Sequence, residues 1–193
     1  MVISSVLAVF IAYILGSIPS GYLVARLVKG VDIRELGDHA TGASNVSREI
    51  GMGAGIATAI GDMAKGAMPM LLAQALQVPD IALIFVALAA VSGHNWSIFL
   101  RFRGGAGLAT TIGVLFAALP REALILVVPY ALLGATVGRR IGQGETGLIL
   151  LVPLMALSWW LGEPPALIIL PVVLGVLIGG YKYWHQIAEG IKR

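Results

Sequence analysis

Cysteine is absent from this chain of 193 residues, and histidine occurs only three times. The lack of cysteine excludes disulfide bonds, thiolate nucleophiles and cysteine metal sites, and three scattered histidines do not predict a metal centre. Charged residues are also scarce, at 12% of the chain, whereas a soluble domain has about 25%. We therefore expect no cofactor and no metal ion. The net charge of +3 is too small to indicate nucleic-acid binding.

Apolar residues are abundant instead, at 58% of the chain. A helix of about 20 apolar residues crosses a membrane. Because no basic segment precedes the first apolar run, we expect that run to be a membrane span and not a cleaved signal. The predicted fold class is an all-α integral membrane protein, a single polytopic domain over residues 1–193. Seven transmembrane helices are expected, at residues 3–25, 52–77, 80–100, 106–119, 122–138, 146–162 and 165–184.

The basic residues predict the orientation of these spans. Of the 13 Lys and Arg residues, eleven lie on one side, in the segment after the first span, two later loops and the C-terminal tail. Cytoplasmic loops carry such an excess of positive charge. We therefore expect the N-terminus outside and the C-terminus in the cytoplasm, with every polar segment considered below on the cytoplasmic side. No feature of the sequence indicates a particular oligomeric state.

The only extended polar stretch runs from Lys29 to Gly55. Its glycines permit close approach of the backbone to a ligand. Ser44 and Asn45 offer hydrogen bonds, and Arg48 offers a guanidinium that can bind phosphate with two parallel hydrogen bonds. These three residues are candidates for binding a substrate phosphate. A solvated loop with an amphipathic interfacial helix near residues 31–37 is the alternative.

An ionisable pair lies within the second predicted span. Asp62 and Lys65 are three residues apart and share a helical face. Charged groups inside a membrane span are costly, which makes them functional candidates. A self-neutralising pair that only fixes helix packing is the alternative.

The richest stretch runs from Ser92 to Gly113. His94 and Asn95 stand in an apolar span and predict a polar pocket, although a lone buried histidine is more often a packing residue. Arg101 and Arg103 precede a helix start that is rich in glycine, and backbone N–H groups at such a start favour an anion. An anchor for anionic membrane lipid is the alternative. The candidate anion ligands are Arg103, Gly104, Gly105 and Gly107.

The first span is interrupted by the sequence GSIPSG, residues 16–21. Such breaks occur in membranes where the backbone lines a cavity or is buried in protein. Small residues also let helices approach closely. Ser17 and Gly21 are therefore candidates for shaping the site.

Four ordered segments resemble the bacterial membrane glycerol-3-phosphate acyltransferases that use acyl phosphate as donor. They are GSIPSG, GASNVSR, GDMAKG and GHNWSIFLRFRGGAGLAT, which begin at residues 16, 42, 61 and 93. The resemblance covers most of the chain. It implies seven spans in the bacterial inner membrane and an active site that faces the cytoplasm. It also implies transfer of a fatty acyl group from acyl phosphate to the 1-hydroxyl of glycerol 3-phosphate, which gives lysophosphatidic acid for phospholipid synthesis.

The resemblance also assigns roles to residues. Asn45, Ser44 and Arg48 match the segment expected to hold the acceptor phosphate, and Arg103 with the glycine turn is expected to hold the acyl phosphate. His94, Asp62 and Lys65 are the expected catalytic group, which shapes the site together with Ser17, Gly21 and Asn95. An acyl phosphate is already activated, so correct alignment and stabilisation of the developing phosphate charge can supply much of the rate.

The chain departs from the family pattern at several positions. Ala106 replaces a lysine between glycines, Asp38 replaces a serine, and Ser97 replaces a proline. Near the C-terminus, Tyr183 and Gln186, or a shifted His185, stand where histidine and asparagine are usual. A divergent paralogue that is a non-catalytic phosphate- or lipid-binding or transport membrane protein is therefore the alternative function.

Overall fold

The computed structural model describes residues 2–126, 129 and 151–190, with the backbone alone for residues 151, 182 and 185–190. All the regular secondary structure in the described part is helical. The α-helices are α1 (Val2–Gly16), α2 (Ser20–Lys29), α3 (Ala43–Glu49), α4 (Met52–Ala75), α5 (Asp80–Asn95), α6 (Leu108–Ala118), α10 (Leu151–Trp160) and α11 (Pro165–Gly190). Two 3-10 helices, η1 (Ile33–Glu35) and η2 (Ile98–Leu100), lie in the connections.

The expected spans agree with these helices to within a few residues at most boundaries. The first expected span is interrupted, as its sequence predicts: α1 ends at Gly16 and α2 begins at Ser20. Proline 19 supplies no N–H group and so does not continue the helix. Most of the span expected at 122–138, and the start of that at 146–162, lie outside the described residues. By length and hydropathy, the described stretches Val2–Lys29 and Asp80–Leu100 are long and apolar enough to cross a membrane.

The polar segment after α2 does not form the amphipathic helix near residues 31–37 that was the alternative interpretation. Only the 3-10 helix η1 forms there, and α3 follows as a short helix that the sequence did not predict. A small apolar cluster of Ala25, Ile33, Val46 and Ile50 holds α2, η1 and α3 together. This cluster makes the polar end a folded unit.

Glycines bring the long helices into backbone contact. A Cβ atom at Gly66 would lie 2.1 Å from the carbonyl oxygen of Thr110, and one at Gly113 would lie 2.0 Å from that of Met63. Helix α4 therefore packs directly on α6. Small residues at helix interfaces are typical of membrane proteins, where close van der Waals packing drives association.

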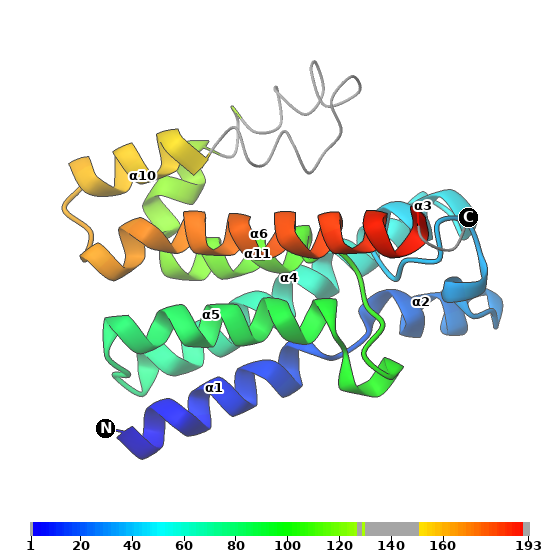
Figure 1. Cartoon of the computed structure of the whole chain (residues 1–193), viewed down its shortest axis with the longest axis horizontal. Coiled ribbons are helices and arrows are strands. Elements are labelled where there is room, and N and C mark those ends of the chain that lie inside the picture. The colour runs from blue at the N-terminus through cyan, green and yellow to red at the C-terminus, as the bar shows by residue number, and fades with distance from the viewer. Residues whose placement is uncertain (1, 127–128, 130–150, 191–193) are drawn as a thin grey trace.

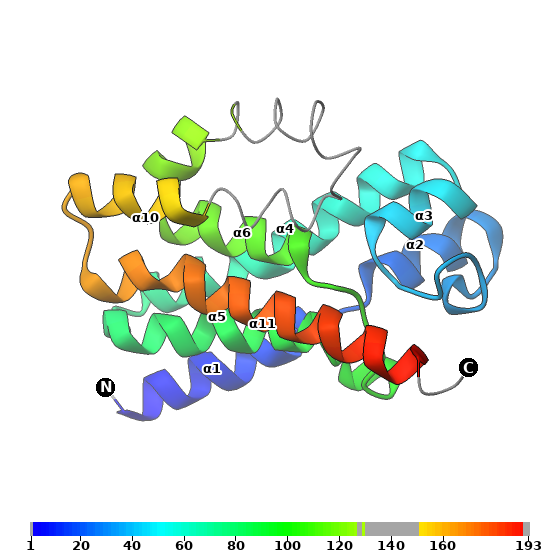
Figure 2. The ribbon, with the colours of Figure 1, turned by 45° about the horizontal axis from the view of Figure 1, so that its top comes forward.

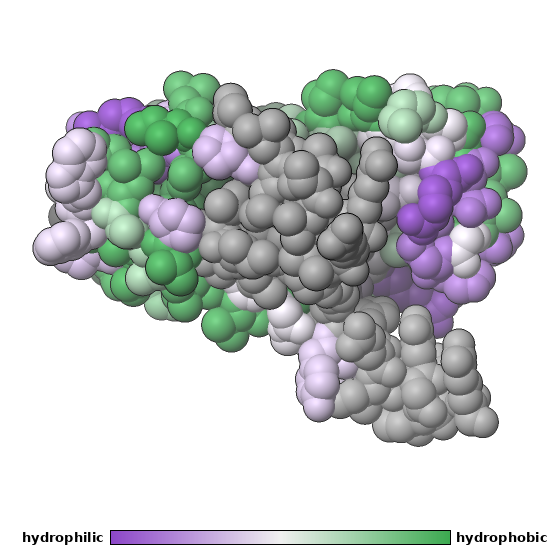
Figure 3. Space-filling model, turned by 90° about the horizontal axis from the view of Figure 1, so that it is seen from above, coloured by the Kyte–Doolittle hydropathy of each residue, from purple (hydrophilic) through white to green (hydrophobic). Residues whose placement is uncertain are grey.

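The long helices run side by side, with the polar segments at one end (Figures 1 and 2). Helix α1 begins at one end of the bundle and α11 finishes at the other. The most hydrophilic residues gather at the end that carries α2 and α3, on the right of Figure 3.

Helix α1 exposes large apolar side chains. Val2, Ile3 and Phe10 are 78%, 77% and 65% exposed. Such an exposed apolar face is typical of a surface in contact with lipid.

Candidate active site

The break between α1 and α2 is tied to two other segments through its carbonyl groups. The hydroxyl of Ser97 donates to the carbonyl oxygen of Ser17 at 2.5 Å, and the ammonium of Lys65 donates to that of Ile18 at 2.6 Å. Ser17 and Ser97 are buried. Because an interrupted helix leaves carbonyl groups without helical partners, these two donors stabilise the break.

Gly21, at the far end of the break, permits a second close approach. A Cβ atom there would lie 1.9 Å from the carbonyl oxygen of Thr41. The start of α2 therefore packs on the polar segment that leads into α3. Ser17 and Gly21, both predicted to shape the site, thus lie where three segments meet.

Asp62, Lys65 and His94 form one buried cluster next to this break. Asp62 Oδ1 lies 2.9 Å from Lys65 Nζ and 3.5 Å from His94 Nδ1. All three side chains are at most 6% exposed. Removing one member leaves another charge or polar group buried without its partner, which is far more costly than the loss of an exposed pair. The structure therefore brings together the three residues predicted as catalytic.

The glycine turn lies directly over His94. Gly105 N–H donates to the carbonyl oxygen of His94 at 3.3 Å, and a Cβ atom at Gly105 would lie 2.5 Å from His94 Nε2. With its amide nitrogen toward the turn, Asn95 donates to the carbonyl oxygens of Val91 at 3.1 Å and Gly105 at 3.2 Å. Asn95 thus holds the turn in place, and Gly105 leaves the space that the imidazole fills.

Backbone strain marks the approach to the turn. Arg101 and Phe102 are consecutive non-glycine residues in the left-handed region, with φ of 56° and 62°. Such residues are uncommon and persist where surrounding structure holds them, as at binding and active sites. Gly107, with φ of 83°, is the N-cap residue just before α6, at a position that only glycine occupies without strain.

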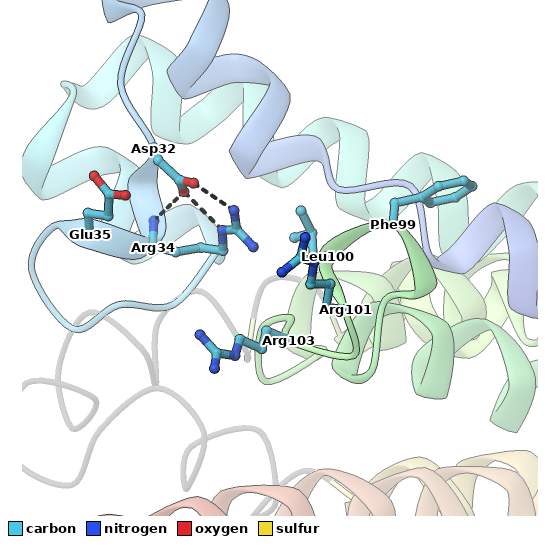
Figure 4. Close-up of a pocket in the computed structure, with 7 residues that line it drawn as sticks. All are labelled: Asp32, Arg34, Glu35, Phe99, Leu100, Arg101 and Arg103. Atoms are coloured by element: carbon cyan, nitrogen blue, oxygen red, sulfur yellow. Dashed lines mark hydrogen bonds and ion pairs between the residues drawn. The ribbon is translucent and has the colours of Figure 1, made fainter.

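A cleft of about 540 Å³ opens between η1 and the loop that follows η2 (Figure 4). It is lined by Asp32, Arg34, Glu35, Phe99, Leu100, Arg101 and Arg103. Arg34 is engaged by Asp32 through two hydrogen bonds, of 3.0 and 2.6 Å. These bonds hold the pKa of the Asp32 carboxyl below its usual range. On the η1 side of the cleft, the charges of Asp32 and Arg34 are therefore paired with each other.

The opposite wall carries Arg101 and Arg103, which are both exposed. Figure 4 shows these side chains extending from the loop on the η2 side of the cleft. Within the part of the chain that the structure describes, neither guanidinium has an ion-pair partner. Among the described residues, no ion pair must therefore open before either guanidinium contacts an anionic ligand.

The Gly37–Arg48 segment supplies a further surface beside the turn. Asn45 is 1% exposed, and its side-chain nitrogen donates to the carbonyl oxygens of Leu36 at 3.0 Å and Ala40 at 2.9 Å. Its oxygen accepts from Asp38 N–H at 3.2 Å. The Asn45 amide is therefore used to shape the loop that it closes.

Ser44 and Arg48 lie one helical turn apart on α3, and both are exposed. Gly42 N, just before this helix, lies 3.5 Å from the position of a Cβ atom at Gly105. The candidate phosphate-binding residues therefore fall into two neighbouring groups, one on α3 and one around the glycine turn. Near the C-terminus, Tyr183 is 66% exposed, and the side chains of His185 and Gln186 lie outside the described residues.

Sequence reasoning missed three contacts. These are the bond from Ser97 to Ser17, the bond from Lys65 to Ile18, and an ion pair of 2.5 Å between Asp38 and Arg48. The change of proline to Ser97 was the signal for the first contact, since it placed a hydroxyl donor in the segment that follows α5.

The chain is similar to known proteins in both sequence and structure. A family model described as glycerol-3-phosphate acyltransferase matches residues 6–193. A glycerol-3-phosphate acyltransferase of Desulforudis audaxviator is 50% identical over 119 residues, which cover 62% of this chain and 59% of that protein. The chain thus matches less than two thirds of that relative's length. Another, of Endomicrobium trichonymphae, is 37% identical over 188 residues and covers 97% of this chain and 92% of that protein.

A solved structure supports the same relationship. The crystal structure of PlsY (YgiH), an integral membrane glycerol 3-phosphate acyltransferase in its glycerol 3-phosphate form, is similar with a TM-score of 0.79 and 32% identity. The match covers 98% of this chain and 92% of PlsY. These findings confirm the predicted all-α membrane fold and the family indicated by the four segments. The chain belongs to the glycerol-3-phosphate acyltransferase family.

Proposed function

We propose that this chain transfers a fatty acyl group from acyl phosphate to the 1-hydroxyl of glycerol 3-phosphate, which gives lysophosphatidate and inorganic phosphate. The observation that carries this proposal is the convergence of the four family segments on one place. The break after α1, the Asp62–Lys65 pair and the His94–Gly107 segment are joined by direct contacts, and α3 begins beside the glycine turn.

Two phosphate groups require two positively charged surfaces. Arg103, with Arg101 beside it, supports a site for the donor phosphate, and the N–H groups at the start of α6 lie next to these cations. Arg48, with Ser44 on the same face of α3, supports a site for the acceptor phosphate. The acceptor hydroxyl then attacks the acyl carbonyl carbon, the bond from that carbon to the phosphate oxygen breaks, and the hydroxyl proton leaves with phosphate or solvent.

The buried cluster supports this reaction by position. His94 lies beneath Gly105, and Asp62 holds the imidazole while Lys65 fixes the break after α1. A rigid turn keeps the donor phosphate aligned with the acceptor, which converts binding energy into rate. We therefore assign Asp62, Lys65, His94 and Asn95 a positioning role under the glycine turn.

The experiment that tests this function compares donors. Purified protein in detergent is supplied with labelled glycerol 3-phosphate and either palmitoyl phosphate or palmitoyl coenzyme A. We expect lysophosphatidate from palmitoyl phosphate alone, and a higher donor KM for the Arg103→Gln variant. Product formed only from palmitoyl coenzyme A would refute the proposed donor.

The second candidate function is a non-catalytic phosphate- or lipid-binding membrane protein. Two substitutions favour it, because Ala106 lacks the charge of the usual lysine and Asp38 brings a carboxylate to Arg48. Binding of glycerol 3-phosphate without ester formation from either donor would support this candidate over the enzyme.

For topology, we propose one domain with seven spans, the N-terminus outside and the C-terminus and active site on the cytoplasmic side of the bacterial inner membrane. The opposite positions of the start of α1 and the end of α11 support an odd number of crossings (Figure 1). The absence of cysteine makes labelling simple. In intact cells, an impermeant maleimide should label Val2→Cys, and it should label Lys29→Cys only after the membrane is opened.

A further inference from the structure

The carboxylate of Asp38 forms an ion pair with the guanidinium of Arg48. Arg48 Nη2 donates to Asp38 Oδ2 at 2.5 Å, and Asp38 Oδ1 also accepts from Ala40 N–H at 3.2 Å. The backbone N–H of Asp38 donates to the side chain of Asn45, which is buried. The position of the carboxylate is therefore set by the loop as well as by its ion pair.

This contact changes what Arg48 offers to a ligand. A guanidinium binds phosphate through the same N–H groups that bind a carboxylate, so a ligand phosphate and Asp38 compete for Arg48. The side chains of Arg48 and Asp38 are 55% and 52% exposed, so the ion pair itself is weak and can open. After it opens, the carboxylate remains near the bound anion and repels it.

We propose that Asp38 is a specificity-determining residue that competes with the acceptor phosphate for Arg48. It weakens binding of a phosphate-bearing acceptor and narrows the difference in affinity between glycerol 3-phosphate and an uncharged polyol. This inference rests on the proposed function, in which Arg48 holds the acceptor phosphate.

The test measures binding, so it does not depend on turnover. Isothermal titration of purified protein in detergent gives the Kd for glycerol 3-phosphate and for glycerol. Asp38→Asn keeps the size of the side chain and removes its charge. A unit charge that repels a nearby dianion in a largely aqueous setting changes affinity about tenfold. We expect Asp38→Asn to lower the Kd for glycerol 3-phosphate by about that factor and to leave glycerol binding unchanged.

A matched control separates this contact from a general change in charge. Glu49→Gln removes the same charge from α3, one residue from Arg48, and its carboxylate lies beside Gly37 instead. We expect this variant to change the Kd by less than about twofold, because Glu49 is only half-buried and makes no direct contact with Arg48. An equal gain from Glu49→Gln would overturn the proposal.

A second background tests the route through Arg48. In an Arg48→Gln chain, Asp38→Asn should give a clearly smaller gain, because competition for Arg48 is absent and only the repulsion between Asp38 and the bound phosphate is relieved. An undiminished gain without Arg48, or an Asp38→Asn chain that binds glycerol 3-phosphate no better than the wild type, overturns the proposal. Failure of the proposed function is a separate result, seen as absence of ester formation in every variant while the Kd comparison still decides the role of Asp38.

Discussion

The ammonium group of Lys65 donates a 2.6 Å hydrogen bond to the carbonyl oxygen of Ile18, in the break that separates α1 from α2. The same ammonium is paired with Asp62 at 2.9 Å. The buried Lys65 ammonium thus has two roles. It neutralises the charge of Asp62, and it donates a hydrogen bond to a backbone carbonyl that has no partner within the interrupted helix. The charged pair in α4 and the break in the first span are one structural unit.

Lys65→Met should destabilise the protein severely, because it removes the ion-pair partner of the Asp62 carboxylate and the donor to the Ile18 carbonyl. Breaking a buried ion pair from one side costs about 3–5 kcal/mol. Thermal unfolding in detergent measures the change. The double variant Asp62→Asn with Lys65→Met should lose less stability than the sum of the two single variants. Additive losses would show that the two groups do not depend on one another.

Gly105→Ala should displace the imidazole of His94, because the new methyl group would lie 2.5 Å from Nε2. Overpacking of this kind costs about 1–3 kcal/mol. The unfolding temperature should fall, and the acyl-transfer rate should fall with it. Gly179→Ala is the matched control, since among the described residues, apart from its chain neighbours and its own helix backbone, no atom lies within 4 Å of that added Cβ. If His94→Ala does not relieve the cost of Gly105→Ala, the imidazole is not the group that fills this space.

Ala106→Lys should strengthen donor binding. Ala106 is exposed between Gly105 and Gly107, so a longer side chain can extend without repacking the core. A charge-assisted hydrogen bond contributes about 1.5–3 kcal/mol, which corresponds to a fall in the KM for acyl phosphate of about tenfold or more. Initial rates over a range of donor concentrations give the KM. Ala106→Gln, similar in length but uncharged, should show little of this gain, and an equal gain from both variants would exclude charge as the cause.

Asp32→Ala should loosen the η1 wall of the cleft, because Asp32 both caps η1 and holds Arg34. Loss of a capping side chain costs about 1–2 kcal/mol. The folded-state pKa of Asp32 is lowered by Arg34, so this stability is present above the ordinary carboxyl pKa of about 3.9. It is lost as the pH falls through the lower folded-state value. Unfolding temperatures of both chains should therefore differ at pH 7 and converge in acid, and a constant difference at every pH would contradict the account.

Much of the fold follows from the sequence, because membrane spans depend on local composition. The boundaries of α4, α5 and α6 fall close to the expected spans, and Pro19 marks the break in the first. The short helix α3 was missed, since its polar residues carry no apolar period and its stability comes from packing against Ala25 and Ile33. Local pattern does not report such contacts.

The sequence predicted which residues belong to the site better than it predicted which of them are in contact. Asp62 and Lys65 share a helical face, so their pairing follows from spacing. The approach of His94 to Asp62 and of Ser97 to Ser17 depends on how α4, α5 and α1 cross, and residues 80 positions apart meet only through that packing. Likewise, the pairing of Asp38 with Arg48 depends on the loop that Asn45 closes.

The most direct test of the central claim is a product measurement on the purified wild-type chain. Acyl phosphate and glycerol 3-phosphate are supplied together, and lysophosphatidate and inorganic phosphate are quantified over time. The account predicts that both products appear together in equal amounts and that neither accumulates at this rate when the protein is omitted. Release of phosphate without the ester, or no reaction at all, would contradict it.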